Sequence, residues 1–141
     1  MKKLFITVFL FNTLFSFSQS DKIIGEYLFE FVNEKNQIEY RLNLKSDGTF
    51  IFHYYTNIAN ANPSITHKYG KGNWNADGKV VSFFSDNKKD FDKKHTLDFS
   101  NSRAHFITKP SRDKSDRIIR TQLKFFESKI FWVKGLDIFK I

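Results

Sequence analysis

Hydrophobic and polar residues alternate along most of the chain after residue 22. The clearest case is residues 38–44, where every second position from Ile38 to Leu44 is hydrophobic and the positions between are polar. Successive side chains of a β-strand point to opposite faces, so this pattern predicts a strand with one buried and one solvated face. Similar patterns predict further strands, at residues 23–32, 49–56, 68–75, 79–85, 95–99, 103–109, 117–127, 129–133 and 136–141.

Turn sequences separate these predicted strands. Asp47-Gly48 and Asp77-Gly78 each follow a strand pattern, and Asp and Gly tolerate the positive φ that tight hairpin turns require. No helical amphipathic period is visible after residue 18. We therefore expect an all-β protein, an antiparallel meander of about eight or nine strands that closes into a small barrel or folds as a sandwich.

Residues 1–18 have the pattern of a secretory signal peptide. Two lysines precede an apolar stretch over residues 4–17, and Ser16 and Ser18 supply the small side chains that precede a cleavage site. The stretch is shorter than the roughly 20 residues that span a bilayer. The sequence thus predicts cleavage before Gln19, a β domain over residues 19–141, and a periplasmic or secreted protein that does not span a membrane. The alternative is an uncleaved N-terminal anchor.

The distribution of charge suggests a second feature. The chain has a formal net charge of +8 and no cysteine, which excludes disulfides and cysteine chemistry. Between Lys88 and Lys124 there are eleven Lys or Arg and five Asp residues. Such an excess attracts an anionic partner, with Arg112, Lys114 and Arg117 as the candidate partner-binding residues; the alternative is a solvated surface that keeps the protein soluble. No signature of nucleic-acid binding is present, and we expect no such partner.

Three short motifs occur in the order typical of one family. They are Gly25-Glu26-Tyr27, Leu42-x-Leu44-x-x-Asp47-Gly48-Thr49-Phe50, and Gly72-Asn73-Trp74 followed by a second Asp-Gly turn. Together they resemble the lipocalin-like (calycin-type) small β-barrel domains of exported bacterial proteins, over residues 23–84. Tyr27 departs from the tryptophan that is usual at that position. The resemblance implies a barrel that holds a small ligand.

Aromatic residues are the candidates for such a ligand site. In residues 49–56 both faces are largely apolar or aromatic, so this strand is central or lines a pocket. Inward side chains of a small barrel either fill its interior or line a cavity for one ligand, and aromatic rings suit a lipid, a hydrophobic metabolite or a sugar. The candidate ligand-binding residues are Phe52, Tyr54, Tyr55, Trp74 and Phe83. The alternative is a packed core, because a domain of this size needs much of its apolar surface to fold.

Catalytic and metal-binding patterns are not recognisable in the sequence. The four histidines, at positions 53, 67, 95 and 105, lie on separate predicted elements without metal-ligand spacing. No nucleophile elbow or phosphate-binding glycine loop is visible. We therefore expect no metal, no cofactor and no enzymatic activity, and we expect a binding module for a small hydrophobic or amphiphilic ligand. The alternative is an interaction protein that binds an anionic envelope component or an acidic protein through its basic C-terminal half.

Overall fold

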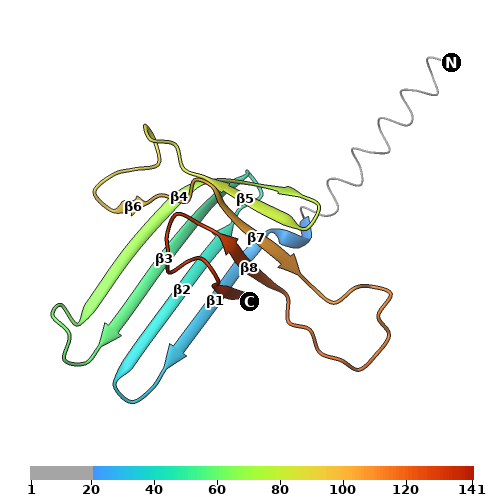
Figure 1. Cartoon of the computed structure of the whole chain (residues 1–141), viewed down its shortest axis with the longest axis horizontal. Coiled ribbons are helices and arrows are strands. Elements are labelled where there is room, and N and C mark those ends of the chain that lie inside the picture. Colours follow the sequence, from blue (N-terminus) through green and yellow to red (C-terminus); the bar gives the residue numbers. More distant parts are fainter. Residues whose placement is uncertain (1–20) are drawn as a thin grey trace.

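Nine strands make up the structure, a computed structural model that describes residues 21–141. Eight of them form a closed antiparallel barrel in the order β1-β2-β3-β4-β5-β7-β8-β9, and β6 pairs in parallel with β4 beyond the end of β5 (Figure 1). The predicted all-β meander is confirmed, and it is a barrel. The strands are β1 (Gly25–Val32), β2 (Asn36–Leu44), β3 (Thr49–Ile58), β4 (Ile65–Asp77), β5 (Val80–Phe84), β6 (His95–Leu97), β7 (Ser102–Ile107), β8 (Gln122–Glu127) and β9 (Asp137–Lys140).

The first and last strands close the barrel. Tyr27 of β1 lies opposite Lys140 of β9 in an antiparallel pairing, which leaves neither strand as a free edge. The hydroxyl of Tyr27 is buried and donates a hydrogen bond of 2.6 Å to the carbonyl of Ile23. The ammonium of Lys140 donates a bond of the same length to the carbonyl of Lys22. These two bonds fix the segment that enters β1 against the end of the chain.

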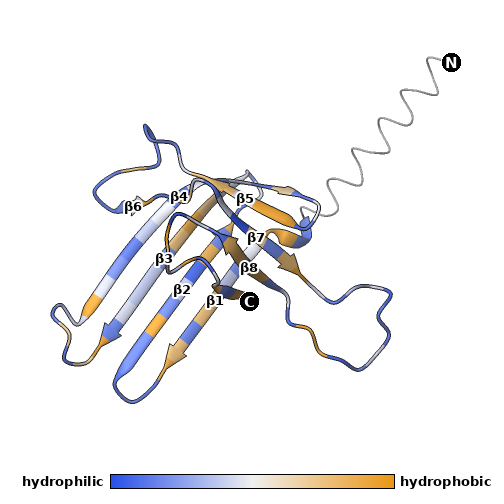
Figure 2. Ribbon diagram, in the orientation of Figure 1, coloured by the Kyte–Doolittle hydropathy of each residue, from blue (hydrophilic) through white to orange (hydrophobic). Residues whose placement is uncertain are grey.

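The predicted alternation decides which side chains point inward. Leu42 and Leu44 are fully buried, and Tyr40 packs against the core from the same face of β2. Figure 2 shows hydrophobic and hydrophilic positions interleaved along β1 to β4, as expected for strands with one dry and one wet face.

Aromatic rings pack against one another inside the barrel. The ring centroids of Phe50 and Phe83 are 5.1 Å apart, and those of Phe83 and Phe125 are 5.3 Å apart. Phe99, from the segment between β6 and β7, lies 4.8 Å from Phe52. Ring pairs at these separations contribute about 0.5–1.5 kcal/mol beyond the burial of their surface. The interior is therefore held by contacts between rings from strands that are not neighbours in the barrel and from the segment between β6 and β7.

Two of the predicted strands are wrong in detail. Residues 129–133 form no strand; Val133 donates to the carbonyl of Ile130 and Leu136 to that of Val133, so the chain turns there. This run is apolar without alternation, and the turn buries Val133 while Phe131 is 86% exposed. Residues 117–121 are irregular, and β8 begins only at Gln122. Alternation alone did not mark this start, because it continues through residues 117–121, which form no strand.

The predicted signal peptide, residues 1–18, lies outside the described residues. In residues 21–141 there is no helix of the length and hydrophobicity that crossing a membrane requires.

Replacing Gly72 with alanine tests the packing of the barrel wall. A Cβ at Gly72 would lie 2.1 Å from the carbonyl oxygen of Phe84 and 3.1 Å from the ring of Phe50, so the backbone of β4 or β5 has to move. We expect Gly72→Ala to lower the free energy of unfolding by roughly 1–3 kcal/mol, as overpacking does in other cores. Urea denaturation measures this, with Asn73→Ala as the control because Asn73 is exposed on the outer face. Equal stability of the two variants would contradict this packing.

Candidate functional site

The five aromatic candidates do not share one lining. Phe52 and Phe83 are buried in the core, at 0% and 3% exposure. Trp74 is also buried, and its indole N–H donates to the carbonyl of Lys45 at 3.0 Å. These three side chains therefore serve packing contacts inside the barrel.

The two tyrosines lie on opposite faces of β3. The half-buried Tyr54 points inward, where its ring centroid is 4.8 Å from that of Trp132 in the 131–135 turn. Tyr55 points outward and lies 5.1 Å from the ring of His67 on β4. Because successive side chains of a strand point to opposite faces, these two neighbouring tyrosines do not line the same site.

A pocket of about 380 Å³ lies where the start of β1, the β4–β5 turn and the end of β7 meet. Ile23 and Phe106, at 1% and 6% exposure, give it an apolar floor. Gly78 makes the tight β4–β5 turn with a φ of +60°, a conformation that glycine adopts without steric cost. We call this site the basic pocket, because the cationic residues that line it are Lys22, Lys79, Lys109 and Arg112.

The charge of the basic pocket is uncompensated within the described part of the chain. None of the described residues that line it is acidic, and none of its four cations is in an ion pair with another described residue. Lys109 donates a hydrogen bond to the carbonyl of Ser115, which folds the β7–β8 connection over one side of the site. Several like charges around a concave apolar surface produce a positive potential that attracts anions.

The three candidate partner-binding residues differ in their surroundings. All lie in the β7–β8 connection, which projects from the barrel (Figure 1). Arg112 lines the basic pocket, and Lys114 is exposed outside it. The guanidinium of Arg117 is 2.7 Å from a carboxylate oxygen of Asp113. Hydrogen bonds from Ser115, and then from Arg117, hold the pKa of Asp113 below its usual range, so this carboxylate offsets the charge of Arg117.

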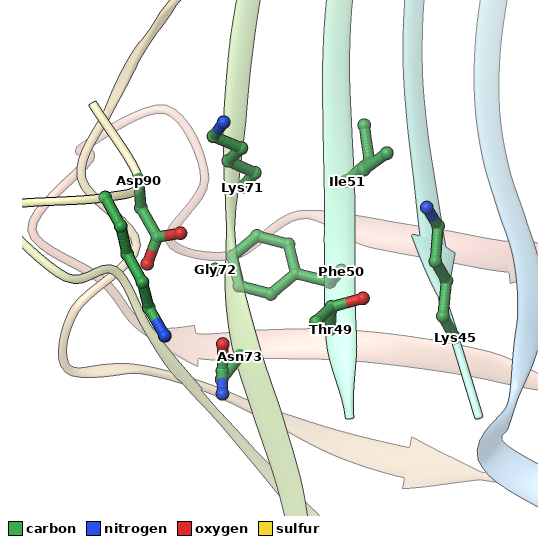
Figure 3. Close-up of a pocket in the computed structure, with 9 residues that line it drawn as sticks. Lys45, Thr49, Phe50, Ile51, Lys71, Gly72, Asn73 and Asp90 are labelled. Carbon is green, nitrogen blue, oxygen red and sulfur yellow. The ribbon is translucent and has the colours of Figure 1, made fainter. Parts of the chain in front are cut away.

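A second pocket, of about 310 Å³, lies on the outer wall of β3 and β4 (Figure 3). Lys45, Lys71 and Lys89 line it together with Asp90. The ammonium of Lys71 is 3.4 Å from Asp92, and the largely buried Asp90 accepts a 2.6 Å hydrogen bond from the backbone of Asp86. This pocket therefore carries mixed charge, and it selects less strongly for an anion than the basic pocket does.

Two histidines that the sequence analysis treated as separate meet on the outer face. The Nε2 atom of His53 on β3 and the Nδ1 atom of His67 on β4 are 2.9 Å apart, at hydrogen-bond distance. The β3–β4 register places His53 opposite Tyr69 and His67 opposite Tyr55, so the two histidines are diagonal neighbours. Both faces of residues 49–56 are largely apolar or aromatic, and His67 precedes the predicted strand at 68–75, so the sequence predicted neither the outward face of this pair nor the register that joins it.

Comparisons with known proteins found no relative of this chain. No family model matches the chain, and no significant match is found among curated proteins or solved structures. The class that the fold defines is therefore architectural: an eight-stranded, closed, antiparallel β-barrel, consistent with the lipocalin-like architecture that the sequence motifs suggested.

The pH dependence of stability tests the environment of His53. Partial burial, followed by the proximity of His67, lowers the pKa of His53 below the usual histidine value of 6.5. Because the folded-state pKa of His53 is lower than the unfolded one, the unfolded chain binds the proton more readily. The free energy of unfolding is therefore highest above pH 6.5 and declines as the pH falls from 6.5 through the folded value. We expect urea denaturation between pH 8 and pH 5 to show a smaller loss of stability in His53→Gln than in the wild type. Parallel curves for the two proteins would refute this effect.

Proposed function

We propose that the protein is an exported, non-enzymatic binding module that holds a small anionic amphiphile in the basic pocket. One observation carries the proposal: a cavity of about 380 Å³ joins a buried apolar floor to four cationic side chains and no acidic one among its described lining residues. Small-molecule sites are usually concave and mostly apolar, with volumes of about 300–1,000 Å³ and a few polar groups that fix the orientation of the ligand.

The two halves of the pocket have complementary roles in this proposal. Ile23 and Phe106 form the floor that the apolar part of the ligand contacts, and each Å² of the ligand's own apolar surface removed from water contributes about 25 cal/mol. Lys79, Lys109 and Arg112 contact its anionic group. A hydrogen bond to a charged group contributes about 1.5–3 kcal/mol, and the planar guanidinium of Arg112 suits a phosphate or carboxylate in particular.

The packed interior supports this site over a ligand in the centre of the barrel. Phe52 and Phe83, which would line a central cavity, contact rings from other strands instead. A ligand there would have to displace Phe99 or Phe125 from the core, and emptying core positions of that size costs several kcal/mol. The basic pocket receives a ligand without such rearrangement.

An anionic envelope component or an acidic protein is the second candidate ligand. The observation that favours it is the exposure of Arg112 and Lys114 on the projecting β7–β8 connection. A large polyanion would contact both side chains, whereas a small amphiphile in the basic pocket would contact Arg112 alone.

Titration calorimetry with dodecyl phosphate, below its micelle-forming concentration, tests the proposed ligand class. We expect one binding site per chain, and a loss of affinity of about tenfold for Lys79→Ala and for Arg112→Ala, because each variant removes a charge-assisted hydrogen bond. Lys114→Ala, in the same connection but outside the pocket, is the matched control and retains wild-type affinity.

Two results would decide against this function. Equal binding of dodecyl phosphate by the wild type and by Arg112→Ala would show that the ligand does not bind in the basic pocket. Absence of dodecyl phosphate binding, together with binding of dextran sulfate that Arg112→Ala and Lys114→Ala weaken equally, would favour the polyanion instead.

A further inference from the structure

We propose that His53 and His67 form a two-nitrogen binding site for a divalent late transition-metal ion, Cu²⁺ above all, on the outer wall of the barrel. This site is separate from the basic pocket and does not depend on the function proposed for it. His53 projects from β3 and His67 from β4, and both belong to the outer face of the same hairpin.

The distance between the two nitrogens suits coordination of a single ion. The Nε2 atom of His53 and the Nδ1 atom of His67 are 2.9 Å apart. Two nitrogens in neighbouring positions of a square-planar site, each about 2.0 Å from the metal, lie about 2.8 Å apart. Rotation of the two rings, so that both lone pairs point to one centre, converts the hydrogen-bonded pair into a chelate.

The β-sheet holds the backbones of the two histidines side by side before any metal arrives. The ring of Tyr69 stacks on that of His53 with a centroid separation of 4.5 Å and an angle of 2° between the planes. Tyr55, beside His67 on the other strand, lies 5.1 Å from it. The register of β3 and β4 fixes both backbones, so little conformational entropy is lost when the two nitrogens bind one ion.

Protons compete with a metal ion for the two facing nitrogens, so the pair binds a metal better at neutral than at acidic pH. Metal binding requires both facing nitrogens to be free of protons, so the proton in the hydrogen bond has to move to the other nitrogen of its ring. Among the charged side chains that act on His53, Glu39 attracts a cation, whereas Arg41 and Lys94 repel it.

The remaining coordination positions face solvent. No group of three or more His, Asp or Glu side chains within residues 21–141 is arranged to hold a metal ion, so water completes the coordination. His95, also on this side of β4, is already engaged, because its Nδ1 atom is 3.1 Å from both carboxylate oxygens of Asp92. Imidazole ligands bind Cu²⁺ more strongly than Zn²⁺ or Ni²⁺, which makes Cu²⁺ the expected ion.

Calorimetric titration with Cu²⁺ at pH 7.5, on the protein without a histidine tag, tests the site. We expect one Cu²⁺ per chain, with an affinity at least tenfold lower in His53→Ala and in His67→Ala. Electron paramagnetic resonance of the wild-type complex should show nitrogen coupling from two imidazoles, and Zn²⁺ should bind more weakly. Binding should weaken at acidic pH, because protons compete with the metal ion for the imidazole nitrogens.

Two single-histidine variants are the matched controls. His95→Ala removes a histidine from the same wall, and His105→Ala removes one that stacks on Phe126 at 4.2 Å, away from the pair. Both should bind Cu²⁺ as the wild type does, and circular dichroism should show that all four variants are folded. Wild-type Cu²⁺ affinity in His53→Ala and His67→Ala would mean adventitious surface binding only and would overturn the proposal.

Discussion

The pairing of β1 with β9 is the constraint on which the rest of the structure depends. An open sheet of this length would leave two unpaired edges, and closing it gives each strand of the barrel a partner on both sides. Closure also gives the sheet an interior face, toward which every second side chain of each strand points. Tyr27 secures this junction, because its buried hydroxyl bonds to Ile23 at the entrance to β1. The aromatic core forms because closure turns the inner faces of β3, β5 and β8 toward a common interior.

A filled interior moves the candidate sites to the surface. Rings from β3, β5 and β8 and from the segment before β7 occupy the centre, so Phe52 and Phe83 stabilise the barrel. One concave surface lies at the junction around Ile23 and Phe106, where a buried apolar floor is surrounded by unpaired cations of the described chain. The outer wall of β3 and β4 offers a different chemistry, imidazole nitrogens held by a sheet. The two proposed sites lie on the same barrel and have no residue in common.

The sequence predicted the strands, but it did not show which residues the closed barrel brings together. Leu42 and Leu44 were identified as inward-facing because a strand with one dry face leaves a direct pattern of alternation. The turn at 131–135 was missed, since a run of apolar residues carries no such period. The conformation of this run depends on the surface against which Trp132 packs. Arg112 was identified from charge alone. Its neighbours Lys22 and Lys79 were not, because they come from segments far apart in the chain.

The sequence by itself determined the all-β class, the hairpin turns, the faces of the long strands and the basic character of the second half. These properties are local: they follow from the backbone period of a strand, from the conformations that Asp-Gly turns allow, and from a sum of charges. Only the tertiary structure decided that the sheet closes, that aromatic rings fill it, that four cations surround one cavity, and that His53 meets His67. Each of these depends on strand register and closure, which arise from packing between residues that the sequence does not place side by side.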